Sequence, residues 1–271
     1  MNTSGQGYQL LAVGDLKYLN LAIRCAASIK CRDKARPIQL VTDLPSDIVQ
    51  NYPRLFDDIT SIVVEPEFAG PLIKLKMYEF SIYQETLFVD ADCLLMKDDI
   101  DLYWKEMSSR YVVTTPGTRR SEGEWYKTSI EKICDLAKTS SIVQMNSGVL
   151  YFKRNERAKV FFDTAIGLVS ELGNFTGHIH QGRGLPDEPY LAIAFSRCNV
   201  DPMPVVNAEG NGLMVSTIGS SDFIFDSRAG VCRFKKGDKE VSPTICHFVG
   251  LRPEDEYERL SKEFLDNFLP K

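Results

Sequence analysis

Short apolar runs alternate with helical patterns as far as residue 90. Four runs have the length and composition of strands, at residues 9–13, 37–41, 59–64 and 86–89. Between them, apolar side chains recur at helical spacing in residues 16–29 and 72–83, and a short helix is predicted at residues 45–52. Strands that alternate with helices are typical of βαβ units. We therefore predict an α/β fold in which helices flank a mainly parallel central sheet.

The pattern becomes more mixed after residue 110. Strands are predicted at residues 111–115 and 148–152, and helices at residues 156–172 and 188–196. Beyond Asp201 we expect a β-rich part and a closing helix, with strands at residues 223–225, 231–234 and 244–249 and the helix at residues 254–268. No linker or change of composition marks a boundary, so the chain is interpreted as a single domain over residues 1–271.

Composition and charge narrow the class of protein. Charged residues make up 25% of the 271 residues and hydrophobic residues 44%, which is typical of a globular domain. The formal net charge of −5 argues against a nucleic-acid partner, which usually meets a basic patch. The N-terminal residues lack the features of a signal peptide, and no apolar run reaches the length of a membrane span. The 7 cysteines contain no C-x-x-C pair and are read as thiols in a reducing compartment, so we expect a cytoplasmic protein.

Acidic residues follow three of the predicted N-terminal strands. Asp15, Asp43 and Asp90 stand just after strand ends, and the ends of parallel strands meet at the edge of a sheet where ligands bind. Asp90 belongs to the sequence Asp90-Ala91-Asp92, which lies between apolar runs. Two carboxylates at positions i and i+2 can converge on a hard divalent cation, which neutralises their mutual repulsion. The alternative for an isolated pair is a solvated turn with two capping acids.

Two further polar segments carry candidate chemistry. Asn146, Ser147 and Gly148 precede a predicted strand, and they are either a plain turn or polar groups that a glycine allows to approach a ligand closely. Asp187 and Glu188 begin a predicted helix, either as acids that stabilise its N-terminus or as carboxylates near a reacting group.

The three histidines fall in two segments. His247 follows a predicted strand, and with two aspartates it would form a mixed oxygen and nitrogen site for a metal such as manganese. A satisfied structural histidine is the alternative. His178 and His180 form an H-x-H pair in the glycine-rich residues 177–184, which read equally well as a loop. We expect residues 177–184 and 115–124 to be loops able to close over a site.

Taken in order, these segments resemble the GT-A glycosyltransferases, and most closely family 8, the glycogenin and bacterial galactosyltransferase-like group. The resemblance covers most of the chain. Its carriers are Gly14-Asp15, Tyr18, Lys74, Phe88-Val89-Asp90-Ala91-Asp92, Asn146-Ser147-Gly148-Val149, Asp187-Glu188 and His247-Phe248-Val249-Gly250. Each motif is short, and the specificity comes from their order and spacing together.

The resemblance implies a metal-dependent glycosyltransferase with a UDP-sugar donor and a Mn²⁺ or Mg²⁺ ion held by Asp90, Asp92 and His247. It also implies a set of donor-binding residues: Ala12, Gly14 and Asp15 at the base and ribose, Tyr18 on the uracil, Lys74 near the donor, and the Asp90-Ala91-Asp92 turn. Arg252 is expected at the diphosphate on chemical grounds, because a guanidinium can bind phosphate. Asn146, Asp187 and Glu188 would flank the transferred sugar as catalytic residues. Family 8 enzymes are retaining, and the same outcome is expected here.

The resemblance further divides the domain into a nucleotide-binding half, approximately residues 1–110, and an acceptor half with the C-terminal metal-ligand segment, residues 111–271. Asp187 or Glu188 would stabilise an oxocarbenium-like transition state or act as a nucleophile. The acceptor stays open among carbohydrate, lipid and protein.

Two departures from the family pattern stand out. Asp187-Glu188 replaces the frequent Asp-Gln pair, and Leu251-Arg252-Pro253-Glu254 replaces the usual Lys-Pro-Trp at the diphosphate. Two other classes are kept as alternatives. One is a haloacid-dehalogenase-type phosphohydrolase with Asp90 as its nucleophile. The other is a non-catalytic protein that keeps the fold and binds a nucleotide-sugar.

Overall fold

The computed structural model describes residues 5–45, 54–179 and 184–268. At its centre is a six-stranded sheet in the order β3 (Asp58–Ser61), β2 (Ile38–Thr42), β1 (Gln6–Ala12), β4 (Glu85–Val89), β11 (Val149–Lys153) and β6 (Val113–Thr114). Strands β3, β2, β1 and β4 pair in parallel, whereas β11 runs antiparallel to both of its neighbours. The predicted α/β fold with a mainly parallel central sheet is confirmed.

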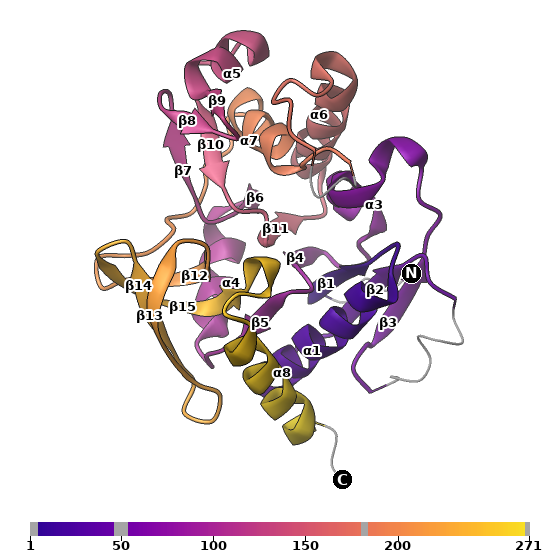
Figure 1. Ribbon diagram of the computed structural model, residues 1–271. Helices are drawn as coiled ribbons and strands as arrows, with labels where there is room; N and C mark the ends of the chain where they lie inside the picture. Colours follow the sequence, from indigo (N-terminus) through magenta and orange to yellow (C-terminus); the bar gives the residue numbers. More distant parts are fainter. Residues whose placement is uncertain (1–4, 46–53, 180–183, 269–271) are drawn as a thin grey trace.

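Two apolar cores lie on the two faces of this sheet, because successive side chains of a strand point to opposite sides. Leu87 and Val89 of β4 join one core, and Phe88 between them joins the other. The first core is covered by α1 (Leu16–Arg32), α4 (Ile100–Arg110) and α8 (Glu254–Phe268). The second is covered by η2 (Gly70–Lys76), α6 (Glu156–Leu172) and α7 (Glu188–Arg197). Figure 1 shows α1 beside α8 on one side of the sheet and α6 beside α7 on the other.

A smaller sheet carries the C-terminal part of the chain to the end of β4. It joins β12 (Asn211–Ser216), β15 (Lys239–His247), β14 (Val231–Lys236) and β13 (Ser220–Asp226), with β5 (Cys93–Leu95) paired to the end of β15. In this antiparallel pair Cys93 lies opposite His247. Since β5 follows β4 after a short turn, the pairing brings His247 to the carboxyl end of a central strand (Figure 1).

The segment between β3 and β4 differs from the prediction. The helix expected at residues 72–83 is the 3₁₀ helix η2, followed by the single-turn α3 (Met77–Phe80). Leu72 and Leu75 are both buried, and a spacing of three places two side chains on one face of a 3₁₀ helix as well as of an α-helix. The apolar pattern therefore did not distinguish the two. The helix predicted at residues 45–52 falls almost entirely outside the described residues.

Several short elements of the second half were not predicted. They are β7 (Gly117–Arg120), β8 (Glu124–Trp125), β9 (Thr128–Ser129), α5 (Ile130–Ala137) and β10 (Ile142–Met145). Because β7 pairs with β10, residues 117–120 belong to a strand and not to the closing loop predicted for residues 115–124. Over the described part of the chain, we find no helix that is both long and apolar enough to cross a membrane.

Candidate functional site

Asp90 and Asp92 lie in the tight turn that joins β4 to β5. The turn is closed by the amide of Cys93, which donates to the Asp90 carbonyl at 3.0 Å. The Asp90 amide donates to the carbonyl of Gly148 at 2.8 Å, and the amide of Phe248 donates to the Asp92 carbonyl at 3.1 Å. Backbone bonds to the residue just before β11 and the residue just after β15 therefore fix both ends of the turn. The side chains of Asp90 and Asp92 keep 16% and 26% exposure, so a cation could reach them.

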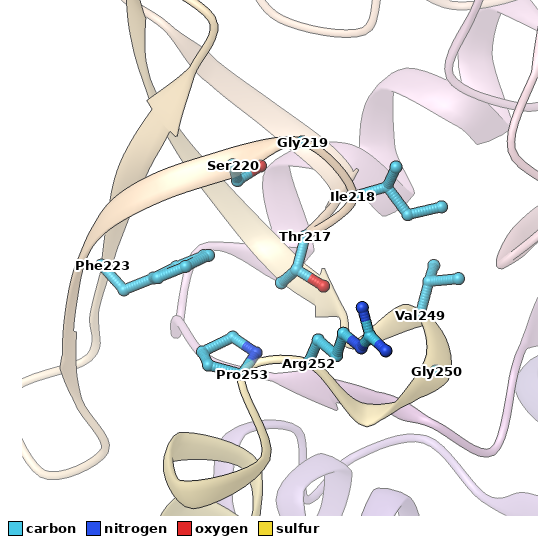
Figure 2. A pocket seen from close by; sticks show the side chains of 9 residues that line it. All are labelled: Thr217, Ile218, Gly219, Ser220, Phe223, Val249, Gly250, Arg252 and Pro253. Atoms are coloured by element: carbon cyan, nitrogen blue, oxygen red, sulfur yellow. The ribbon is translucent and has the colours of Figure 1, made fainter.

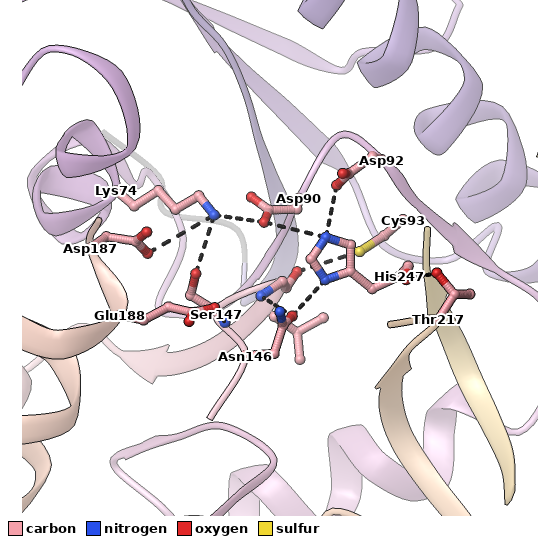
Figure 3. Close-up of polar contacts among 12 residues, drawn as sticks. Lys74, Asp90, Asp92, Cys93, Asn146, Ser147, Asp187, Glu188, Thr217 and His247 are labelled. Atoms are coloured by element: carbon pink, nitrogen blue, oxygen red, sulfur yellow. Dashed lines mark hydrogen bonds and ion pairs between the residues drawn. The ribbon is translucent and has the colours of Figure 1, made fainter. Parts of the chain in front are cut away.

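The imidazole of His247 completes this group (Figure 3). Its Nε2 lies 3.0 Å from Asp92 Oδ1 and 3.9 Å from Asp90 Oδ2. Its Nδ1 lies 2.5 Å from Asn146 Oδ1. Because an amide oxygen only accepts hydrogen bonds, Nδ1 carries a proton that it donates to Asn146. Without a metal, Nε2 of the protonated ring donates to Asp92, and its lone pair would become available to a metal when that proton leaves. Asn146 therefore sets the tautomer that a metal ligand needs.

Gly148 is required by this arrangement. A Cβ atom at this position would lie 2.3 Å from His247 Nδ1, far inside van der Waals contact. The amide of Gly148 also donates to Asn146 Oδ1 at 3.1 Å. A glycine is thus needed here for the close approach of the His247 imidazole, and its close approach to a ligand stays a prediction.

Lys74 places a positive charge on the other side of Asp90. Its Nζ lies 2.6 Å from Asp90 Oδ2, 3.3 Å from Ser147 Oγ and 4.0 Å from Asp187 Oδ2. Burial lowers the pKa of Lys74, but the charges of Asp187 and Asp90 outweigh burial and raise that pKa above its ordinary value. Lys74 is therefore a fixed cation that joins β4, the Ser147 turn and the start of α7 (Figure 3).

Asp187 and Glu188 at the start of α7 have different surroundings. Glu188 accepts from the Ser147 amide at 3.0 Å through Oε1 and from the Tyr126 hydroxyl at 2.7 Å through Oε2. Burial, and then the charge of Asp187, raise the pKa of Glu188 to about 7. Asp187 is only 4% exposed, and its Oδ2 has no hydrogen-bond partner among the described residues. Neither side chain makes a capping hydrogen bond, but both lie at the start of the helix, so stabilisation of the N-terminus through the helix dipole stays an alternative.

The electrostatics of the aspartate pair favour a bound cation. Burial raises the pKa of Asp90, and it outweighs the opposing charge of Lys74. Burial also acts to raise the pKa of Asp92, but the charge of His247 and its hydrogen bond outweigh burial and lower that pKa. Burial acts to lower the pKa of His247, but the charge of Asp92 and its hydrogen bond outweigh burial and raise that pKa. The positive charges of Lys74 and His247 thus stabilise the two carboxylates, and a bound divalent ion would take over part of this role.

The donor set fits a divalent metal. Two ligands about 2.1 Å from one ion and at right angles to each other lie about 3 Å apart, close to the observed 3.0 Å and within a small adjustment of 3.9 Å. Asp92, Cys93 and His247 also have ligand atoms within 4.8 Å of one another. The Cys93 thiol, however, donates to the Gly148 carbonyl at 3.6 Å, and burial raises its pKa well above the ordinary value. A neutral thiol is a poor ligand, so Asp90 is the better third member.

The predicted base and ribose residues lie at the end of β1, beside β2. Gly14 has a φ of 83°, and its amide donates to Asp43 Oδ1 at 2.8 Å. Asp15 caps α1, because its Oδ1 accepts from the Lys17 amide at 3.0 Å. The Ala12 carbonyl accepts from the hydroxyl of Thr42 at 2.6 Å. These contacts bring the ends of β1 and β2 together. The roles of Ala12, Gly14 and Asp15 at a base and ribose, and of Tyr18 on the base, remain predictions.

A cavity of about 730 Å³ lies between the β12–β13 turn and the 3₁₀ turn η3 (Val249–Leu251). Arg252 and Phe223 both line it (Figure 2), and Arg252 forms no ion pair with a carboxylate of the described residues. Thr217 also lines the cavity, and its amide donates to the His247 carbonyl at 3.0 Å. The cavity therefore adjoins the strand end that carries His247.

The structure brings most of the predicted site residues together and adds one that was missed. Lys74, Asp90, Asp92, Asn146, Asp187, Glu188 and His247 form one connected group. Tyr126, whose hydroxyl reaches Glu188, is 62 positions away in the sequence, and no motif pointed to it. His180 of the H-x-H pair lies outside the described residues, and the His178 ring packs against Tyr126 at 5.2 Å.

The sheet order and the similarity to solved structures show that the fold is of the GT-A type. Neither the family models nor the curated proteins match the sequence. Among solved structures, the galactosyltransferase LgtC bound to donor and acceptor sugar analogs is similar over 98% of this chain and 97% of its own, with a TM-score of 0.59 and 16% identity. The glycosyltransferase GlyE of Streptococcus pneumoniae TIGR4 has a TM-score of 0.50 and 14% identity over 75% of this chain, which covers 46% of GlyE. At these identities the similarity establishes the fold.

Proposed function

We propose that the chain is a metal-dependent glycosyltransferase that transfers a sugar from a nucleotide-sugar, specifically a UDP-sugar, to an acceptor. The observation that carries this proposal is the group formed by Asp90, Asp92 and His247 at the carboxyl end of β4, with His247 Nε2 at 3.0 Å and 3.9 Å from the two carboxylates. In sheets of this kind, ligands bind beyond the carboxyl ends of the strands. The motif order supports family 8 and, with it, retention of the anomeric configuration.

Asp90, Asp92 and His247 would hold a Mn²⁺ or Mg²⁺ ion, which would act as a Lewis acid on the diphosphate. Arg252 would bind the diphosphate from the neighbouring cavity, since a guanidinium can pair with phosphate oxygens in a bidentate manner. Lys74 keeps the Asp90 carboxylate in place and adds positive charge next to the leaving group. Burial strengthens these interactions, and because the groups are already fixed, little reorganisation is needed as charge develops.

The carboxylates of α7 would face the sugar. Glycosyl transfer proceeds through an oxocarbenium-like transition state, whose positive charge a nearby carboxylate stabilises. Asp187 has a buried oxygen without a hydrogen-bond partner among the described residues, and Glu188 lies next to it. Either could act electrostatically or as a nucleophile. Asn146 would support the site through His247.

The donor half of the proposal has a direct test by thermal unfolding. UDP-, GDP- and dTDP-sugars are added with and without Mn²⁺, and the shift in melting temperature is recorded. A ligand at a hundredfold excess over its dissociation constant stabilises the native state by about 2.7 kcal/mol. We expect UDP-sugars to stabilise the protein in a Mn²⁺-dependent way. No shift in melting temperature with any of these donors, with or without Mn²⁺, would contradict the proposal.

Turnover separates an enzyme from a protein that only binds. UDP-sugars that give a shift are incubated with carbohydrate, lipid and protein acceptors, and UDP release is followed. Binding with no release against any of them would favour the non-catalytic alternative. No observation favours the phosphohydrolase alternative, and the contacts of Asp90 with Lys74 and His247 do not distinguish the two roles.

A further inference from the structure

The β8–β9 hairpin has an unusual turn. Trp125 pairs with Thr128, so the connection consists of only Tyr126 and Lys127. Their φ angles are 52° and 55°, in the left-handed region. Two-residue hairpin turns of this kind normally use glycine, asparagine or aspartate, because a larger side chain is strained there. Strain of this sort persists only where the surroundings impose it, and it is concentrated at functional sites.

The contacts of Tyr126 show what holds the turn. Its hydroxyl donates to Glu188 Oε2 at 2.7 Å. Its ring packs edge-on against Trp125 at 5.1 Å and against His178 at 5.2 Å. The turn thus directs one hydroxyl toward the buried end of α7.

Glu188 is the point where three distant segments meet. The Ser147 amide donates to Oε1 at 3.0 Å, so Ser147 and Tyr126 each engage one oxygen of the carboxylate. Ser147 Oγ in turn lies 3.3 Å from Lys74 Nζ. The hairpin is therefore linked through Glu188 and Ser147 to Lys74, the cation that pairs with Asp90.

We propose that Tyr126 is a positioning residue of the transfer site: its hydroxyl fixes the orientation of the Glu188 carboxylate beside Asp187, where the sugar would lie. The inference rests on the proposed function for the identity of the reaction. The contact itself does not depend on that function. If Tyr126 were only a tether for the hairpin, its removal would affect stability and the pKa of Glu188 but leave kcat unchanged.

The contact has a measurable consequence in the free protein. Glu188 faces the carboxylate of Asp187, the ammonium of Lys74, the amide of Ser147 and the hydroxyl of Tyr126. Burial and Asp187 raise the pKa of Glu188, whereas the hydrogen bond from Tyr126 favours the ionised form and lowers it. Removing the hydroxyl should therefore raise the pKa of Glu188 further.

The experiment is a pH titration by NMR of protein with ¹³C-labelled glutamate carboxyl groups. The signal of Glu188 is assigned by its loss in Glu188→Gln. We expect Tyr126→Phe to raise the pKa of Glu188 by about half a unit or more, the size of effect of one hydrogen bond to a carboxylate. The control is Tyr78→Phe, which removes the hydroxyl that donates to the Asn155 carbonyl away from the site, and it should leave the pKa unchanged. No difference between Tyr126→Phe and wild type would overturn the inference.

If Tyr126→Phe does not fold, a second variant that keeps the contact can be measured. Replacing Tyr126 by 3-fluorotyrosine makes its phenol a stronger hydrogen-bond donor, so the pKa of Glu188 should fall. An unchanged pKa would again count against the contact.

Kinetics then test the positioning role. With a UDP-sugar that turns over, Tyr126→Phe should lower kcat about tenfold while KM for the donor changes little. In a Glu188→Gln background the same change should cost little, because its effect passes through the carboxylate. A shifted pKa without turnover of any nucleotide-sugar would mean that the contact is real and the proposed function is wrong. Turnover with additive effects of the two substitutions would mean that the function holds and the positioning role is wrong.

Discussion

His247 lies between the side-chain amide of Asn146 and the carboxylates of Asp90 and Asp92, and these contacts indicate a role for Asn146. The family resemblance implied that Asn146 flanks the transferred sugar. In the structure, Asn146 Oδ1 accepts from His247 Nδ1 and from the Gly148 amide, so its visible task is to orient the imidazole. Its role next to the sugar stays a prediction. Orientation by an outer partner is a common feature of metal-binding histidines.

Asn146→Ala should weaken Mn²⁺ binding by about 10–100-fold, because the imidazole loses the partner that fixes its tautomer. Mn²⁺ affinity is measured by electron paramagnetic resonance in the presence of UDP. Asn146→Asp, which keeps an acceptor oxygen at the same place, serves as the matched variant and should retain most of the affinity. Equal affinity in Asn146→Ala and wild type would show that the amide does not support a metal ligand.

Gly148→Ala should disrupt the same site by steric contact. The added Cβ would lie 2.3 Å from His247 Nδ1, so the ring must move away from the aspartates. Mn²⁺ binding should be lost in a protein that still folds. Gly167→Ala in α6 is the control, since nothing lies within 4 Å of its added Cβ and alanine favours a helix by about 0.5–1 kcal/mol. Normal Mn²⁺ binding by Gly148→Ala would contradict the assigned position of His247.

Glu188 should make the stability of the protein depend on pH. Its pKa is raised to about 7 in the folded state, above the ordinary value of 4.5, so the folded state holds this proton more tightly than the unfolded state. The resulting stabilisation is complete below about pH 4.5 and is lost as the pH rises through about 7. The free energy of unfolding of Glu188→Gln, measured with urea between pH 5 and 8, should therefore fall less with rising pH than that of wild type. Parallel pH profiles would be inconsistent with the raised pKa.

At the scale of elements, α5 ends in a conformation that its sequence does not favour. Its C-cap residue, Lys138, has φ 51° and ψ 48°, where glycine is usual. Lys138→Gly should raise the free energy of unfolding by up to about 1 kcal/mol, because the left-handed region carries a penalty for residues with a Cβ. Thermal or urea unfolding measures the change.

Lys132→Gly provides the comparison within the same helix. Lys132 is exposed in the first turn of the helix, and glycine in a helix costs up to about 1 kcal/mol relative to alanine. The two substitutions should therefore have opposite signs. A loss of stability in both variants would show that the strain at Lys138 is not significant.

Elements with a strong local pattern could be predicted from the sequence, and those defined by tertiary pairing could not. Helices α6 and α8 were predicted with their observed bounds, because their apolar periodicity is regular and Asn155 caps α6. Strand β5 has three residues, and β8 and β9 have two each. Segments this short have no readable period, and they become strands only through their partners.

At the scale of the whole molecule, the site is a junction of segments that the fold brings together. The sequence indicated the residue types, and the topological rule that ligands bind at strand ends indicated the edge of the sheet. The distance between His247 and the aspartates was not predictable without the pairing of β5 with β15. The Tyr126 contact was not predictable either, since it requires the position of a hairpin relative to α7. Arg252 was found beside a cavity that adjoins His247, and its contact with a diphosphate remains a prediction.

The most direct measurement is UDP release from UDP-hexoses, with and without Mn²⁺, by wild type and by Asp92→Asn. We predict that release by wild type requires Mn²⁺, through transfer or slow hydrolysis, because the leaving diphosphate needs the positive charge of an ion that Asp90, Asp92 and His247 would hold. Asp92→Asn keeps the size of the side chain and removes its charge, so the Mn²⁺-dependent release should disappear. Release that is the same without Mn²⁺, or that survives unchanged in Asp92→Asn, would contradict the proposed metal-dependent transfer.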